Sequence, residues 1–126
     1  MKSFPDLRVG QLSMYLVETV YTLTRKFPKE EGYGLTSQVR RAVVSIPSNI
    51  AEGHTREHIK EYLHHLSMAQ PSLVEVETQV EIATRLTYLL PSEFEDLVRD
   101  IRSLGKQLYG LRNALRRSQT NNDGSN

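Results

Sequence analysis

The chain has 126 residues, of which 38% are hydrophobic and 25% charged, with a formal net charge of +1. This length supports one domain with one hydrophobic core. The sequence contains no cysteine, which excludes a disulfide scaffold and thiol catalysis. It shows neither a long apolar run nor an apolar leader, so we expect a cytoplasmic protein without a membrane span.

Helical periodicity begins near the N-terminus and predicts a first helix over about residues 6–27, which ends at Pro28. Its expected buried stripe is Leu12, Leu16, Thr19, Leu23 and Phe27. The linker KEEGYG follows, and a second helix is predicted over 34–53, with Thr36 or a neighbour as its cap. The apolar stripe of the second helix is Leu35, Val39, Ala42, Val43, Ile46 and Ile50.

A third helix is predicted over about residues 57–90, and Pro71 inside it predicts a kink or a local break. The fourth helix starts after Leu90, where Pro91 and Ser92 are suited to a cap and first turn. Its leucines follow a heptad pattern. We expect the folded domain to cover residues 1–118 and the polar segment 119–126 to be disordered.

Four helices with short connections predict an all-α fold, an antiparallel up-down-up-down four-helix bundle. Val74, Val98 and Tyr109 are apolar residues outside the expected stripes. They indicate more apolar surface than one bundle hides, so we expect an oligomer.

Metal-dependent chemistry has little support. His54, His58, Glu61 and His65 would share one helix face if the third helix began early, as zinc ligands do; a solvated or interface face is the alternative. Three further carboxylates invite comparison with di-metal bundles: these are Glu75, Glu77 and Glu81. We favour an ion pair of Glu75 or Glu77 with Arg40 or Arg41, and we predict no enzymatic activity, catalytic residue, cofactor or metal.

Charge is unevenly distributed along the chain. Residues 1–50 carry +3, residues 51–98 carry −6 and residues 99–126 carry +4. Cations on the last helix lie off its leucine seam, and such a basic face is what phosphate contacts require. The candidate nucleic-acid-binding residues are Arg99, Arg102, Lys106, Arg112, Arg116 and Arg117, with Arg40 or Arg41 as further candidates.

The polar face of the second helix carries a distinctive set of residues. Arg41, Ser45, Ser48 and Glu52 lie on it at helical spacing around Pro47. The segment GLTSQVRRAVVSIPSNIAEG closely resembles the signature of the 23S rRNA intervening-sequence protein family. The resemblance extends to FPKEEGYG before it and SLVEVETQVEIATRL after it, and covers about residues 4–117. The signature residues, which we interpret as structural, are Arg40, Arg41, Ser45, Pro47, Ser48, Asn49, Glu52 and Gly53.

The resemblance implies a left-handed bundle that assembles as a ring-like homopentamer. It also implies a relationship to the accessory protein of diversity-generating retroelements, which binds nucleic acid and a reverse transcriptase. The chain departs from the family at Gly10, where a large aromatic residue is usual, and at Pro71.

We therefore expect a non-enzymatic homo-oligomer that acts as an RNA or nucleic-acid scaffold. The alternative is an accessory subunit that binds a nucleic-acid enzyme, since an acidic middle segment lies beside basic ends. A metal-dependent enzyme is the third possibility.

Overall fold

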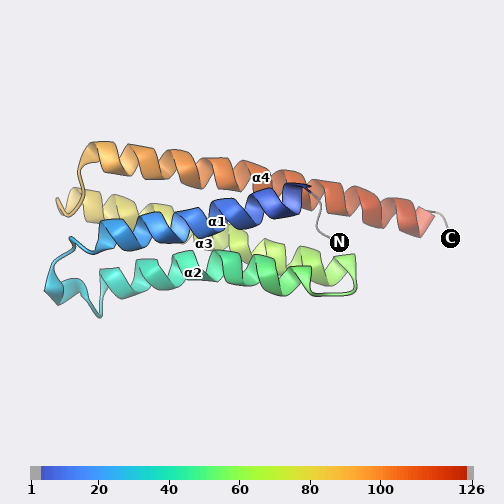
Figure 1. Ribbon diagram of the computed structural model, residues 1–126, viewed down its shortest axis with the longest axis horizontal. Helices are drawn as coiled ribbons and strands as arrows, with labels where there is room; N and C mark the ends of the chain where they lie inside the picture. The colour runs from blue at the N-terminus through green and yellow to red at the C-terminus, as the bar shows by residue number, and fades with distance from the viewer. Residues whose placement is uncertain (1–3, 125–126) are drawn as a thin grey trace.

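The computed structural model describes residues 4–124, which form four α-helices and contain no strand. Helix α1 spans Phe4–Thr24, α2 spans Leu35–His54, α3 spans Ile59–Arg85 and α4 spans Pro91–Gly124. A short 3₁₀-helix, η1, spans Lys29–Glu31 in the connection between α1 and α2. The chain reverses at each connection, so neighbouring helices run in opposite directions (Figure 1).

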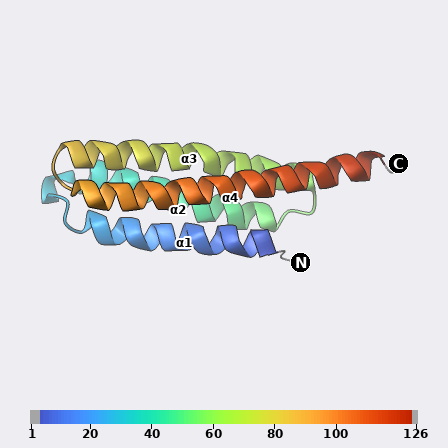
Figure 2. The ribbon, with the colours of Figure 1, turned by 90° about the horizontal axis from the view of Figure 1, so that it is seen from above.

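Each helix packs against two others: α1 contacts α2 and α4, and α3 contacts α2 and α4. The helices lie side by side in both views, and the C-terminal end of α4 projects beyond the rest of the bundle (Figures 1 and 2). No helix among the described residues is both long and apolar enough to cross a membrane.

The buried stripe of α2 is confirmed, because all six predicted apolar residues of this helix are buried. In α1 the prediction was partly wrong. Val9, Ser13, Leu16, Val20 and Thr24 are buried, whereas Leu12, Thr19 and Leu23 are only partly covered. Two hydroxyl residues take core positions because each donates to a carbonyl of its own helix, Ser13 to Gly10 and Thr24 to Val20, both at 2.8 Å.

Helix α3 is shorter at its end than the periodicity predicts. Thr87 adopts a left-handed backbone with φ 66°, and the N–H groups of Thr87 and Tyr88 bond to the carbonyls of Thr84 and Ala83. This arrangement is the Schellman termination of a helix. The helix is nevertheless continuous through Pro71, so the local break predicted there is absent.

A glutamate side chain accepts a backbone hydrogen bond at the start of α2 and another does so at the start of α4. The N-cap residue of α2 is Gly34, and Glu31 Oε1 accepts from the Leu35 N–H at 3.2 Å, so Thr36 is not the cap. In α4, Glu93 Oε1 accepts from the Leu90 N–H at 2.9 Å, as in a capping box. Glu93 also pairs with Lys26 after α1, and chiefly this hydrogen bond lowers the pKa of Glu93.

Helix α4 runs on to Gly124, through positions where the sequence predicts disorder from residue 119. Once a helix is formed, each added residue gains one backbone hydrogen bond, so a polar segment can extend it. Residues 125 and 126 lie outside the described part of the chain.

Tyr62 of α3 is buried and donates a hydrogen bond to Asp6 of α1. Burial, and secondly this bond, raise the pKa of Tyr62. Because the Tyr62 hydroxyl ionises less readily in the folded protein than in the unfolded chain, it stabilises the fold at pH values below its unfolded-state pKa of about 10. This contribution is lost as the pH rises above that value. We expect Tyr62→Phe to cost roughly 1–2 kcal/mol near pH 8. Urea unfolding of both proteins should show this difference shrinking above about pH 10; a constant difference would contradict the assignment.

Candidate nucleic-acid interface

The six cations predicted to bind nucleic acid all lie on α4, but the structure divides them into three groups. Arg99 and Arg102 lie beside acidic residues, Arg112 is turned into the bundle, and Lys106, Arg116 and Arg117 are exposed.

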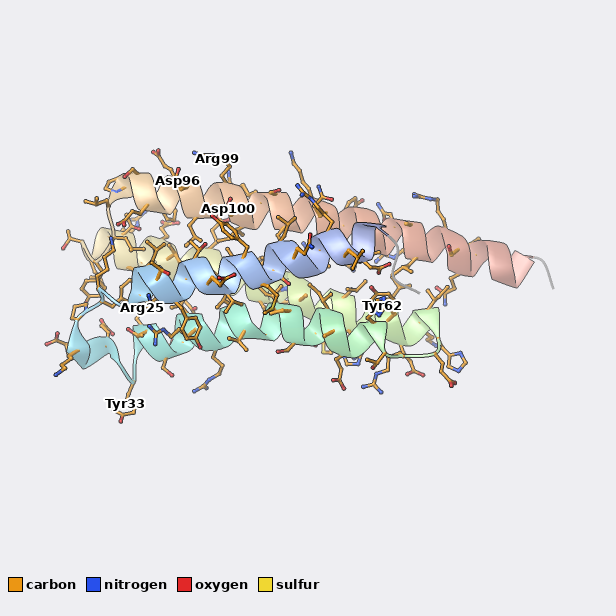
Figure 3. The ribbon with its side chains drawn as sticks, in the orientation of Figure 1. Arg25, Tyr33, Tyr62, Asp96, Arg99 and Asp100 are labelled. Carbon is orange, nitrogen blue, oxygen red and sulfur yellow. The ribbon has the colours of Figure 1, made fainter. Side chains whose placement is uncertain are left out.

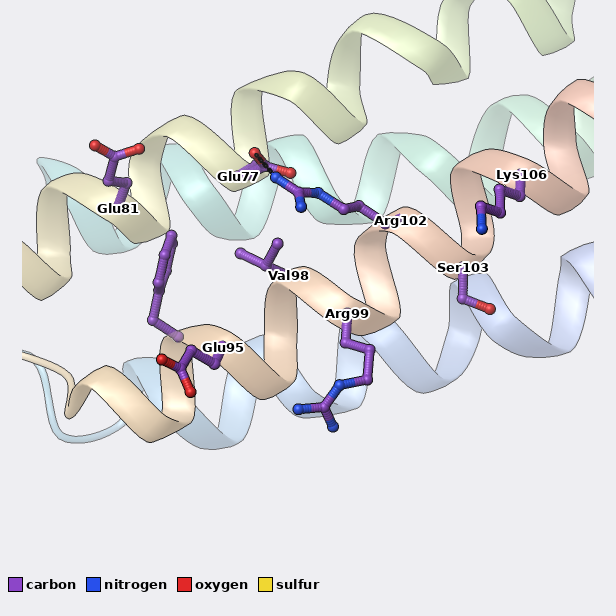
Figure 4. Close-up of a pocket in the computed structure, with 9 residues that line it drawn as sticks. Glu77, Glu81, Glu95, Val98, Arg99, Arg102, Ser103 and Lys106 are labelled. Carbon is purple, nitrogen blue, oxygen red and sulfur yellow. Dashed lines mark ion pairs between the residues drawn. The ribbon is translucent and has the colours of Figure 1, made fainter.

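Arg99 and Arg102 are held in ion pairs. Arg99 Nη2 lies 3.2 Å from Asp96 Oδ1 on the same helix, and both side chains are on the outer side of α4 (Figure 3). Arg102 reaches across to α3, where its Nη2 lies 3.6 Å from Glu77 Oε2 (Figure 4). The depression around them has a volume of about 700 Å³, and Glu81, Glu95 and Lys106 also line it. Positive and negative charges are therefore nearly balanced here, which disfavours a polyanion.

Arg112 serves the packing of α4 on α3. Its Nη1 donates to Gln70 Oε1 at 3.3 Å, and its Nε is buried without a partner among the described residues. A guanidinium used in this way is poorly placed to contact phosphate, so we remove Arg112 from the candidate interface.

Lys106, Arg116 and Arg117 form the remaining group, which we call the basic end of α4. None of them makes an ion pair with a described residue. Arg116 donates to Asn113 Oδ1 at 3.2 Å, which leaves its charge uncompensated. At a rise of 1.5 Å per residue, the group spans about 16 Å of helix.

The sequence reasoning missed a second cluster of basic side chains, in which Arg56 is paired with Glu52. Arg56, Lys60, His64 and His65 line a depression of about 430 Å³, together with Glu61, where α2 connects to α3. Because α3 and α4 are antiparallel and Gln70 contacts Arg112, the start of α3 lies toward the basic end of α4. The available signal was the four-residue spacing of Arg56 and Lys60, with His64 four residues further along the chain.

The shared histidine face does not form. Helix α2 ends at His54 and α3 begins at Ile59, so the four positions do not belong to one helix. Among the described residues, no group of three His, Cys, Asp or Glu side chains could hold a metal ion.

A family model for the 23S rRNA-intervening sequence protein matches residues 5–110. The chain belongs to this family. It is also similar to the crystal structure, at 1.70 Å resolution, of a protein of unknown function from the S23 ribosomal protein family of Bacteroides thetaiotaomicron VPI-5482. The TM-score is 0.80 at 21% identity, over 87% of this chain and 99% of that one, which shows a common fold. No curated protein matches the chain.

The family signature joins α2 to both helices that pack against it, α1 and α3. Arg40 Nε donates to Thr24 Oγ1 at 2.8 Å and its guanidinium lies 4.4 Å from the centre of the Tyr21 ring. Ser45 Oγ bonds to Ser72 Oγ of α3 at 2.6 Å. Arg41 makes no ion pair among the described residues, and it lines a polar depression with Glu75. The predicted pairing of Glu77 with Arg40 or Arg41 is wrong, because Glu77 pairs with Arg102.

The other signature residues act locally. Ser48 donates to the Val44 carbonyl, Asn49 to the Ser45 carbonyl, and Glu52 pairs with Arg56 at 2.8 Å. These bonds stay within α2 or reach the connection that follows it. Pro47 lies within the continuous helix α2, and Gly53 is buried against α3.

Proposed function

We propose that this protein is a non-enzymatic, homo-oligomeric scaffold that binds RNA or DNA through the basic end of α4. One observation carries the proposal: Lys106, Arg116 and Arg117 are exposed cations without an ion pair among the described residues. Arg116 and Arg117 lie further toward the C-terminal end of α4 than the depressions that Lys106 lines together with Glu77 of α3. Phosphate binding needs such cations, and their contacts release condensed counterions.

The oligomer in this proposal is a ring of antiparallel up-down-up-down protomers, and five copies is the number that the family resemblance implies. Met14, Tyr15, Val74 and Tyr109 are large, exposed apolar residues on the protomer, and burial between copies would remove them from water. A ring would also repeat the basic end of α4 around one rim. That repetition would give a protein of net charge +1 the local charge density that a polyanion requires.

Binding of a structured RNA tests this function directly. The intact protein should shift the fluorescence anisotropy of a labelled RNA hairpin near 50 mM salt. Each phosphate contact contributes about −0.9 to the slope of log K against log salt, so the affinity should fall steeply by 200 mM. Absence of binding to RNA and to DNA at the lower salt would overturn the proposal.

A protein-binding accessory subunit is the second candidate function, and the opposite end of the bundle favours it. Ile82, Leu86 and Leu90 are exposed apolar residues around the connection between α3 and α4. Tyr33, in the connection between α1 and α2, is fully exposed at that same end (Figure 3). A stoichiometric protein that co-purifies from the native host and survives nuclease treatment would favour this function.

A further inference from the structure

The outer surface between α1 and α2 contains a groove of about 420 Å³ whose floor includes Gly10. A Cβ built at Gly10 meets nothing within 4 Å, so the protomer's own packing does not require a glycine at this position. Glycine weakens a helix interior relative to alanine. Exposed Leu7, Met14 and Tyr15 also line this groove. A close approach from outside the protomer would account for both the glycine and the exposed apolar side chains.

The surface between α3 and α4 has complementary features on another side of the bundle. Tyr109 is 59% exposed and Val74 is 64% exposed. Gly105 and Val74 line a depression of about 380 Å³ on this surface. Gly105 lies one helical turn before Tyr109, so α4 presents a depression followed by a large side chain.

The ion pair of Lys26 with Glu93 sets the register between α1 and α4. The two helices are antiparallel (Figure 2). Gly10 lies sixteen residues before Lys26, and Tyr109 lies sixteen residues after Glu93. Likewise, Met14 lies twelve residues before Lys26, and Gly105 lies twelve residues after Glu93. At about 1.5 Å per residue, Gly10 is therefore level with Tyr109 along the bundle, and Met14 is level with Gly105.

Rotation about an axis parallel to the bundle keeps residues at their level, as in a cyclic oligomer. We propose that Tyr109 of one copy enters the Gly10 groove of the next, while Met14 of that next copy enters the depression at Gly105. The inference rests on the homo-oligomer of the proposed function and specifies its interface. Each large side chain then faces a glycine, which is how helices approach closely.

Charge supports the same pairing. Glu18 is exposed beside the groove and makes no ion pair among the described residues. It lies eight residues before Lys26, whereas Arg102 lies nine residues after Glu93, so the two are within one residue of the same level. Glu18 of one copy would therefore meet Arg102 of its neighbour, and add a second carboxylate to the one supplied by Glu77.

Cysteine cross-linking tests the interface, because the natural chain contains no cysteine. The double variant Glu18→Cys/Arg102→Cys, oxidised in its native state, should give a ladder of covalent multimers on a denaturing gel. The matched control is Gln11→Cys/Arg102→Cys. Gln11 lines the same groove but lies seven residues away, about 10 Å along the helix. This offset exceeds what a disulfide spans, so the control should stay largely uncross-linked.

The mass of the native protein distinguishes failure of the homo-oligomer from failure of this interface alone. A monomeric wild-type protein would overturn both the homo-oligomer and this interface. An oligomer in which the two double variants cross-link equally, or neither cross-links, would overturn the interface alone.

Tyr109→Ala provides an independent measurement. It should raise the dissociation constant of the oligomer at least tenfold and leave the helix content unchanged. Tyr33→Ala removes a fully exposed tyrosine outside the interface and should leave the dissociation constant unchanged. Unchanged assembly of the folded Tyr109→Ala variant would contradict the proposal.

Discussion

Replacement of Gly53 by alanine should destabilise the protein by roughly 1–3 kcal/mol, the usual range for overpacking. A Cβ at this position would lie 2.7 Å from His65 Cβ and 2.9 Å from Tyr62 Cδ1. It would also lie 3.3 Å from the Tyr62 carbonyl oxygen. The Tyr62 carbonyl is part of the α3 backbone, and His65 Cβ is bonded directly to it. Rotation of a side chain therefore cannot relieve the contact. The end of α2 and the start of α3 would have to separate.

The sign of this effect distinguishes packing from helix propensity. Alanine is the better helix former by about 1 kcal/mol, so a helix whose glycine serves no purpose in packing is stabilised by the same substitution. Gly110 is the matched control, because it lies within α4 and its Cβ would meet nothing within 4 Å. Urea unfolding at equal protein concentration should show Gly53→Ala less stable and Gly110→Ala slightly more stable than wild type. Equal stability of Gly53→Ala and wild type would refute the close contact.

Neutralising the basic end of α4 should have the largest effect on function. The triple variant Lys106→Gln/Arg116→Gln/Arg117→Gln is expected to lose roughly a hundredfold or more in RNA affinity at low salt, because it removes three candidate phosphate contacts. These exposed side chains make no ion pair with a described residue, so the fold should be unaffected. Anisotropy titration measures the affinity, and circular dichroism verifies the helix content.

The double variant Arg99→Gln/Arg102→Gln is the control for this loss. It removes two cations from the same helix, but these cations are paired with Asp96 and Glu77. Its affinity should therefore fall much less than that of the triple variant. An equal or greater loss would place the interface around Arg99 and Arg102 instead.

Much of the fold was predictable because the helices alternate apolar and polar residues with helical spacing. The stripe of α2 is the clearest case, since its six predicted apolar residues are all buried. In α1 the pattern was ambiguous: Leu12 and Leu23 compete with Ser13 and Thr24 for the core. Hydrogen bonds to carbonyls one turn earlier decide in favour of the hydroxyls, and no hydrophobicity pattern reveals them.

The candidate interface was predictable only as far as the identity of its helix. Spacing places six cations on α4, but whether each is free depends on residues of α3 that are distant in sequence. Glu77 neutralises Arg102, and Gln70 draws Arg112 inward. The cluster at the start of α3 depends similarly on the turn after His54, which brings Arg56 beside Lys60 and His64. Such pairings follow from the packing of helices and not from the periodicity of one helix.

The salt dependence of RNA binding tests the central claim most directly. The slope of log K against log salt should be smaller for the triple variant of the basic end than for wild type, by roughly 0.9 for each phosphate group that the variant no longer neutralises. The Arg99→Gln/Arg102→Gln variant should keep a slope close to that of wild type. If the triple variant keeps the wild-type slope, Lys106, Arg116 and Arg117 do not contact phosphate, and the proposed nucleic-acid interface is wrong.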